Sequence, residues 1–233
     1  MFQKIKRQKI TLQEGLVDMR DKYEEELKKL NSSISQMGKM IELAIESSVI
    51  SLMGRDVESA KAVRLNDYAI NDMEREIESQ CMKLLLQQQP MAGDLRTITA
   101  ALKMITDMER IGDHAAAIAD LVLQLPDFTY NKMSEISDMS TEIINMIHDC
   151  IISFVEKDYD KAKNVIVSDD KIDELYHSIK SDLIEKIKKT EEGEQLLDYF
   201  LIAKYLERIG DHATNIAEWV IFALTGKKEI RKN

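Results

Sequence analysis

The stretch Glu109-Arg110-Ile111-Gly112-Asp113-His114 occurs a second time as Glu207-Arg208-Ile209-Gly210-Asp211-His212. The two copies lie 98 residues apart (from 109 to 207) and continue alike, through 115–120 and 213–218. An identity of this length at a fixed spacing indicates an internal duplication with a unit of roughly 100 residues. Each copy keeps a Glu and an Asp one helical turn apart within an otherwise apolar segment, and this pair sets the question of function.

The similarity between the two halves also extends upstream of this stretch. Residues 51–56 parallel 153–158 at a spacing of 102 (from 51 to 153). Because the spacing falls to 98 at the repeated stretch, the connection between the second and third segments is longer in the first unit. The sequence therefore predicts two related units with the same order of segments.

The composition favours helices. The chain of 233 residues has only 2 Pro and 8 Gly, and its long segments have helical periodicity. It contains no apolar run of about 18 residues, so no transmembrane helix is expected. We predict an all-α fold of two tandem, sequence-related three-helix bundles, at 19–126 and 132–226.

Turn and capping residues place the helix ends. Asp56 and Asp158 are suitable N-caps, and Pro90 ends the preceding helix. The predicted helices run from about 19 or 21 to 53 (with a break at 31–33), and over 56–88, 94–125, 132–156, 158–189 and 194–224.

The two ends of the chain are expected to lie outside the bundles. Residues 1–18 are basic and lack the apolar core and the cleavage site of a secretory signal. Gln13-Glu14-Gly15 resembles a translated ribosome-binding site, so Met19 is the expected start of the folded protein. Residues 227–233 form a tail.

The charge and the cysteines narrow the function classes. A formal net charge of −10 argues against nonspecific nucleic-acid binding, which requires a cationic face, and is compatible with binding cations or basic protein surfaces. Cys81 and Cys150 have no metal-type spacing, and we interpret them as buried, reduced thiols of a cytosolic protein.

A helical wheel places the acidic pair of the first unit on the core side. Glu109 and Asp113 fall within about 40° of an apolar stripe that begins at Ile98. Arg110 and His114 fall in the opposite sector and are expected to face solvent. Buried carboxylates without partners are costly, so they need cations, protons or metal.

The second unit repeats this arrangement. Glu207 and Asp211 continue an apolar stripe, and Arg208 and His212 face away from it. Asp107, in the first unit, is predicted to be a solvated position.

The facing helices carry acids rather than basic partners. In the first unit the stripe continues through Asp67, Asn71, Glu74 and Glu78, and in the second through Asp169, Asp173, Tyr176 and Lys180. Carboxylates at positions i and i+4 lie about 6 Å apart, close enough to bridge two metal ions. Facing acidic stripes would make oxygen-rich clusters that a cation neutralises.

Two alternatives to a metal-binding regulator stay open. The acids could be solvated or paired with lysine in a metal-free helical adaptor, a reading favoured in the second unit by Lys180. A carboxylate-bridged metalloenzyme, an oxidase or a phosphohydrolase, is the other alternative. Against it, the repeated Glu-x-x-His ligands of di-iron bundles, a Ser/His/Asp set and a Gly-rich phosphate loop are all missing.

The chain from about 19 to 226 resembles the PhoU family. The resemblance rests on the doubled Glu-Arg-Ile-Gly-Asp motif, on Gln-Pro-Met-Ala-Gly-Asp-Leu-Arg at 89–96 and on Glu-Glu-Leu-Lys-Lys-Leu at 25–30. It implies two similar three-helix bundles and multinuclear metal sites, with iron in some members; zinc, manganese, magnesium and calcium stay open. On matching positions it assigns Glu109, Asp113, Glu207, Asp211, Asp67, Asn71, Asp169, Asp173 and Asn215 as ligands, to which the acidic stripe adds Glu74.

The resemblance also implies a role. Members are non-catalytic regulators that limit uptake by the phosphate ABC transporter and repress phosphate-regulon signalling through the sensor kinase. The implied partners are the transporter ATPase and the phosphate-sensing histidine kinase. The implied protein is a cytoplasmic homodimer that reaches the membrane only through these partners. In the first unit Ala117 stands where the second has Asn215, so equal occupancy of the two sites is not expected.

Overall fold

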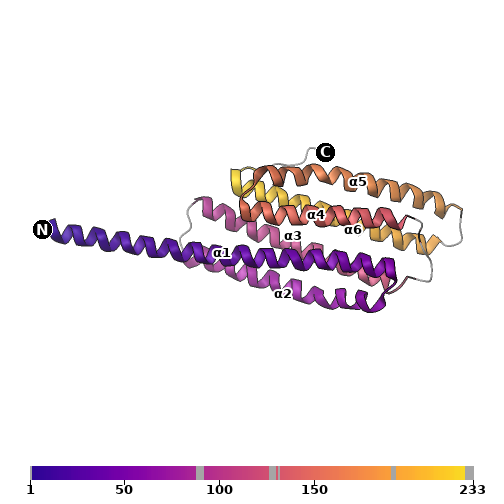
Figure 1. The fold of residues 1–233 in the computed structure, drawn as a ribbon, viewed down its shortest axis with the longest axis horizontal. Coiled ribbons are helices and arrows are strands. Elements are labelled where there is room, and N and C mark those ends of the chain that lie inside the picture. The colour runs from indigo at the N-terminus through magenta and orange to yellow at the C-terminus, as the bar shows by residue number, and fades with distance from the viewer. Residues whose placement is uncertain (1, 88–91, 126–129, 131, 190–192, 229–233) are drawn as a thin grey trace.

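The computed structural model describes residues 2–87, 92–125, 130, 132–189 and 193–228, with side chains from Arg20 onward except at 194 and 195. Within this part the secondary structure is entirely helical (Figure 1). The helices are α1 (Phe2–Gly54), α2 (Val57–Gln87), α3 (Ala92–Val122), α4 (Met133–Glu156), α5 (Tyr159–Ile187) and α6 (Gly193–Thr225).

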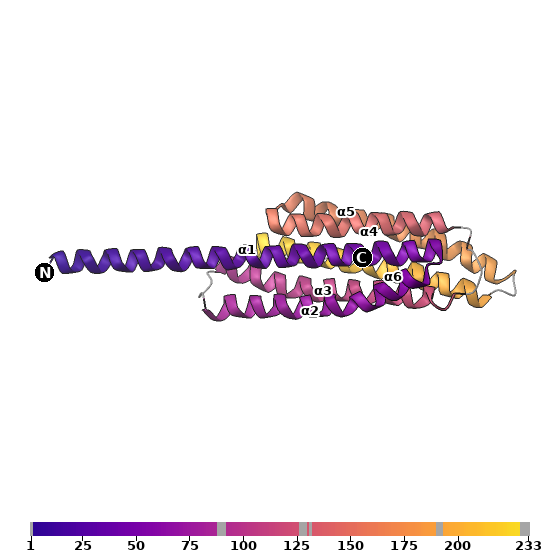
Figure 2. The same ribbon diagram turned by 60° about the horizontal axis from the view of Figure 1, so that its bottom comes forward.

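The helices form the two predicted three-helix bundles. α1, α2 and α3 pack on one another, as do α4, α5 and α6, and the two bundles meet through α3 with α6 and α1 with α4 (Figures 1 and 2). The all-α prediction and the tandem duplication are therefore confirmed.

The turns between the first two helices of each bundle show the duplication at atomic detail. Arg55 and Lys157 both adopt the left-handed conformation, with φ of 54° and 60°. Asp56 Oδ1 then accepts hydrogen bonds from the backbone N–H groups of Glu58 and Ser59, both at 3.1 Å. Asp158 caps α5 in the same way, because its side chain accepts from the backbone N–H of Lys161 at 3.0 Å.

Most predicted helix ends agree with the structure to within a few residues, but the start of the first helix was wrong. α1 begins at Phe2 and continues without a break through 31–33. Most of the predicted turn at 89–94 and most of the linker at 126–131 lie outside the described residues.

α3 and α6 each pack on their own bundle and on the other bundle. Met108 and Ile111 of α3 and Leu206 and Ile209 of α6 are fully buried. Each of these helices therefore has two covered faces. The helical wheel assumed a single buried stripe and did not predict the second covered face.

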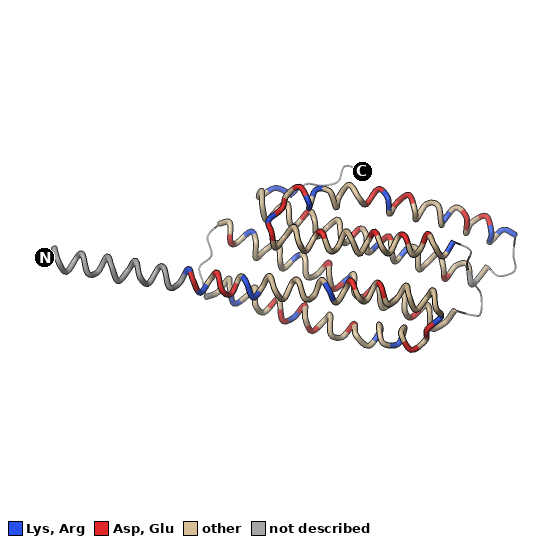
Figure 3. The backbone as a smooth tube through the Cα atoms, viewed as in Figure 1, with Lys and Arg blue, Asp and Glu red and all other residues tan. Residues whose placement is uncertain are grey.

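Charged residues occur at intervals along every helix of the described chain (Figure 3). In that part, no helix combines the length and the hydropathy needed to cross a membrane, as the sequence predicted.

Candidate functional site

Glycine brings the helices of each bundle close together at the repeated stretch. A Cβ atom at Gly112 would lie 3.1 Å from Ile70 and 3.5 Å from Asp67 Oδ1. A Cβ atom at Gly210 would lie 3.2 Å from Ile172 and 3.3 Å from Asp169 Oδ1. Both glycines therefore permit close helix contact, and at each one a carboxylate of the neighbouring helix lies against the Glu-Arg-Ile-Gly-Asp turn.

The first cluster comprises Asp67, Asn71 and Glu74 of α2 with Glu109 and Asp113 of α3. The Asn71 amide donates to Asp67 Oδ2 at 3.5 Å, whereas Asp67 Oδ1 and Asn71 Oδ1 are buried and have no hydrogen-bond partner among the described residues.

One guanidinium lies beside the α3 pair of this cluster. Arg110 Nη1 donates to Asp113 Oδ2 at 2.9 Å, and its Nε lies 3.5 Å from Glu109 Oε2. Arg110 is exposed, as predicted, so it folds back over the pair from the solvent side.

Negative charge is poorly compensated in this cluster. Burial, followed by the Asp113 charge, raises the pKa of both Asp67 and Glu109. Burial, followed by the Glu78 charge, raises the pKa of Glu74. Desolvation and mutual repulsion therefore both disfavour the ionised form, and a bound cation would reverse this balance.

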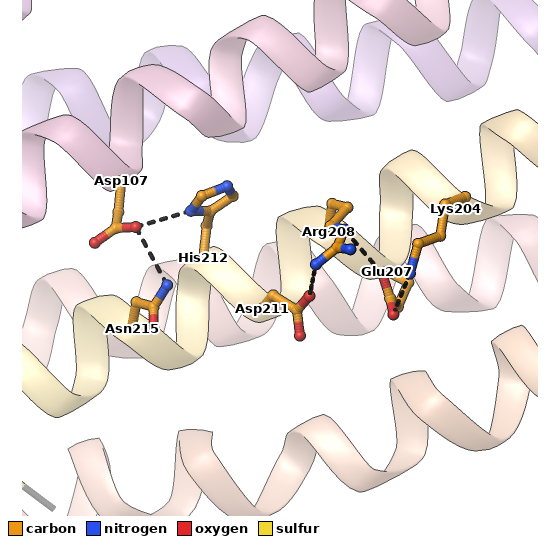
Figure 4. Close-up of polar contacts among 7 residues, drawn as sticks. All are labelled: Asp107, Lys204, Glu207, Arg208, Asp211, His212 and Asn215. Atoms are coloured by element: carbon orange, nitrogen blue, oxygen red, sulfur yellow. Dashed lines mark hydrogen bonds and ion pairs between the residues drawn. The ribbon is translucent and has the colours of Figure 1, made fainter. Parts of the chain in front are cut away.

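The second cluster carries its own cation. Lys204 Nζ donates to both carboxylate oxygens of Glu207, each at 2.6 Å (Figure 4). Arg208 lies between Glu207 and Asp211, donating to Asp211 Oδ2 at 3.1 Å (Figure 4). Asp169 of α5 is only 2% exposed, and Asp173 lies one turn beyond it.

Lys204 was not predicted from the sequence. Lys180 was expected as the basic residue of the second stripe, but its ammonium lies over the ring of Tyr176, 5.9 Å from the ring centroid. Two signals were available: Lys204 precedes Glu207 by three residues, and the corresponding position of the first unit is Thr106.

The seam between the bundles holds residues that were predicted to face solvent. Asp107 Oδ1 accepts from His212 Nδ1 at 2.8 Å and from the Asn215 amide at 3.4 Å (Figure 4). The His114 ring lies 5.5 Å from each of the Tyr205 and His212 rings, between centroids. The solvent-facing assignment of both histidines and of Asp107 was wrong, because the second bundle covers the outer face of α3.

Asn215, which the resemblance assigned to the second cluster, thus has its amide directed at α3. Its hydrogen-bond partner, Asp107, belongs to the other bundle. The structure therefore places this side chain at the seam, whereas Glu207 and Asp211 lie on the side of α6 that faces α5 (Figure 4).

The two clusters differ in how well they suit a metal ion. Across the described residues, no three His, Cys, Asp or Glu side chains converge as a ready ligand set. The first cluster nevertheless offers hard oxygen donors, and the buried, unpartnered Asp67 Oδ1 and Asn71 Oδ1 fit a cation such as Mg²⁺, Mn²⁺, Ca²⁺ or iron. In the second cluster the Lys204 ammonium already contacts Glu207.

Fold and site together define a class: a tandem three-helix-bundle protein with an acidic helix pair repeated in each bundle. A model of the PhoU domain matches the chain twice, at residues 34–122 and 136–220. The chain belongs to the PhoU family.

Relatives match over nearly the full chain. A protein of Clostridium acetobutylicum named phosphate-specific transport system accessory protein PhoU homolog is 36% identical over 209 residues, 88% of this chain and 95% of the relative. A Thermotoga maritima homolog with the same description is 34% identical, over 88% of this chain and 90% of the relative.

Solved structures show the same fold. The crystal structure of PhoU from Pseudomonas aeruginosa has a TM-score of 0.84 and 32% identity, covering 88% of this chain and all of that one. The structure titled as the phosphate transport system regulatory protein PhoU from Streptococcus pneumoniae has a TM-score of 0.85 and 28% identity, covering 90% of this chain and all of that one.

Proposed function

We propose that this protein is a non-catalytic regulator of phosphate homeostasis. It limits uptake by the phosphate ABC transporter and represses phosphate-regulon signalling through the sensor kinase. The observation that carries the proposal is the match over 88% of the chain to relatives named as accessory proteins of the phosphate-specific transport system. The partners are the transporter ATPase and the phosphate-sensing histidine kinase.

The proposal includes a metal ion at the acidic clusters, above all at the first. Asp67 and Asn71 from α2, with Glu109 and Asp113 from α3, would hold it, and Glu74 lies on the same stripe. The bound ion would supply the positive charge that this cluster lacks. The oxygen donors suit iron, manganese, magnesium or calcium better than they suit zinc, which prefers nitrogen and sulfur ligands.

In this role the chain's own residues join the helices. The carboxylates of α3 and the side chains of α2 would hold the cation, whose positive charge would stabilise the contact between the two helices. The protein then acts from the cytoplasm as a homodimer, and its membrane contact runs through its partners. A rigid bundle surface suits a protein that regulates by binding.

A phosphate-regulon reporter in a deletion strain tests the proposal. The strain is complemented with the wild type, with Glu109→Gln plus Asp113→Asn, or with Asp72→Asn plus Glu76→Gln as a matched control on the exposed side of α2. At high phosphate the wild type and the control should repress the reporter, and the first-cluster variant should release repression at least threefold.

Two failures of this experiment are separable. If the wild type does not repress the reporter, the regulatory role is wrong. If the first-cluster variant represses as well as the wild type at equal protein level, the cluster does not contribute to regulation.

A further inference from the structure

The second cluster differs from the first at four positions. Asn71, Glu74, Glu78 and Thr106 of the first unit correspond to Asp173, Tyr176, Lys180 and Lys204 of the second. The first set of positions thus holds five carboxylates and one guanidinium: Asp67, Glu74, Glu78, Glu109, Asp113 and Arg110. The second holds four carboxylates and three cationic groups: Asp169, Asp173, Glu207, Asp211, Lys180, Lys204 and Arg208.

Lys204 is the cation that contacts the carboxylate at the core of the second cluster. Its ammonium lies 2.6 Å from both oxygens of Glu207, whose side chain is 14% exposed. The same ammonium lies 5.1 Å from the centroid of the Tyr176 ring, within reach of a cation–π interaction. The Tyr176 ring, which stands at the position of Glu74 in the first unit, therefore contacts the ammonium in place of a carboxylate.

The counterpart position in the first bundle cannot supply this charge. Thr106 is exposed, and its hydroxyl donates to the Leu102 carbonyl oxygen at 3.3 Å, one turn back on its own helix. Within the part of the chain that the structure describes, the cationic group within 4 Å of the Glu109 carboxylate is therefore that of Arg110, at 3.5 Å.

We infer that Lys204 is an internal cation that takes the place of a metal ion in the second cluster. The chain then contains one cluster that binds a cation and one whose negative charge is neutralised by its own side chains. Metal binds tightly only to the first bundle, while the Lys204 ammonium holds Glu207 in the second. This inference rests on the proposal that the first cluster binds a metal.

The two bundles would respond differently to loss of the metal ion. Loss of metal would loosen the contact between α2 and α3, whereas the contact between α5 and α6 would persist because its cation is covalently part of the chain. Helix packing in the second bundle would not depend on metal, whereas helix packing in the first bundle would.

Reciprocal exchange of the two counterpart residues tests the inference. The full-length chain is stripped of metal with a chelator, and Mn²⁺ alone is titrated by calorimetry into the wild type, Lys204→Thr and Thr106→Lys. The wild type should bind Mn²⁺ at one tight class of site. Lys204→Thr should gain a second class at least tenfold tighter than any second class of the wild type, and Thr106→Lys should weaken the tight class at least tenfold.

Matched variants separate charge from fold. Lys204→Arg keeps a cation and should titrate like the wild type. Lys204→Gln keeps the length and the helix propensity of lysine, and it should gain the second class even if the threonine variant folds poorly. In both neutral variants Mn²⁺ should raise the melting temperature by more than it does in the wild type.

The titrations test the role of Lys204 separately from metal binding at the first cluster. If the wild type loses its tight site in Glu109→Gln but Lys204→Thr and Lys204→Gln titrate like the wild type, Lys204 is not a substitute cation and only the inference fails. Two equally tight classes in the wild type would overturn it as well. If neither the wild type nor the neutral variants bind Mn²⁺, the metal proposal and this inference fail together.

Discussion

The two bundles share their backbone plan and differ in the electrostatics of one cluster. Both carry the same six-residue stretch, both seat a buried carboxylate against a glycine, and both cover the acidic pair with an arginine. Only the second adds Lys204, at 2.6 Å from Glu207. The repeated motif therefore specifies helix contact, whereas neighbouring residues outside the motif determine whether its carboxylates are already paired with a cation.

The largest loss of stability is expected at the glycine contacts that the two bundles share. Gly210→Leu should lower the free energy of unfolding by about 3 kcal/mol, because even its Cβ would lie 3.2 Å from Ile172 and 3.3 Å from the Asp169 carboxylate. Gly112→Leu should have a similar effect through Ile70. Urea denaturation followed by circular dichroism measures both.

Gly54→Leu is the control for these substitutions, since no atom lies within 4 Å of the Cβ position there. It should change stability by less than about 0.5 kcal/mol. Equal, small effects at all three glycines would mean that the helices do not meet as closely as described.

A smaller loss of stability is expected at the seam between the bundles, where corresponding positions of the two units hold different residues. Tyr205 packs on His114, and its counterpart Asp107 accepts hydrogen bonds from His212 and Asn215. Tyr205→Ala should lower the free energy of unfolding by about 2 kcal/mol through lost packing. Asp107→Ala should cost about 1 kcal/mol, the net value of the hydrogen bonds. The reverse order in urea denaturation would show that the polar contact, and not the aromatic one, holds the bundles together.

The smallest effect concerns pH and separates the two clusters in the metal-free protein. Because the pKa of Glu109 is raised in the folded state, its stabilising contribution is present at low pH and is lost as the pH rises from about 4 through the raised pKa. Relative to the wild type, Glu109→Gln should therefore become more stable between pH 4 and 7, by less than about 1 kcal/mol. Glu207→Gln removes the partner of Lys204 and should therefore not stabilise the protein.

Chemical denaturation in chelator at a series of pH values gives this difference directly. Saturating Mn²⁺ should reverse the sign for Glu109→Gln, because the ion favours the ionised carboxylate. A flat difference under both conditions would contradict the charge imbalance assigned to the first cluster.

The duplication, the six helices and the acidic pairs could be predicted because each is a periodic feature of the sequence. The seam was missed because a wheel with one buried stripe cannot show that α3 is covered on two sides, which left Asp107 and His114 assigned to solvent. Lys204 was missed because it lies off the stripe and reaches Glu207 only through the length of its side chain. The start of α1 was missed because Gln13-Glu14-Gly15 was interpreted as a translated ribosome-binding site, whereas the helix continues through these residues.

Anomalous X-ray diffraction from crystals of the full-length chain grown with Mn²⁺ tests the central claim most directly. We expect an anomalous difference peak among Asp67, Asn71, Glu109 and Asp113, and the Lys204 ammonium in contact with Glu207 in the second bundle. A peak of equal height beside Glu207 and Asp211, or a peak there alone, would contradict it.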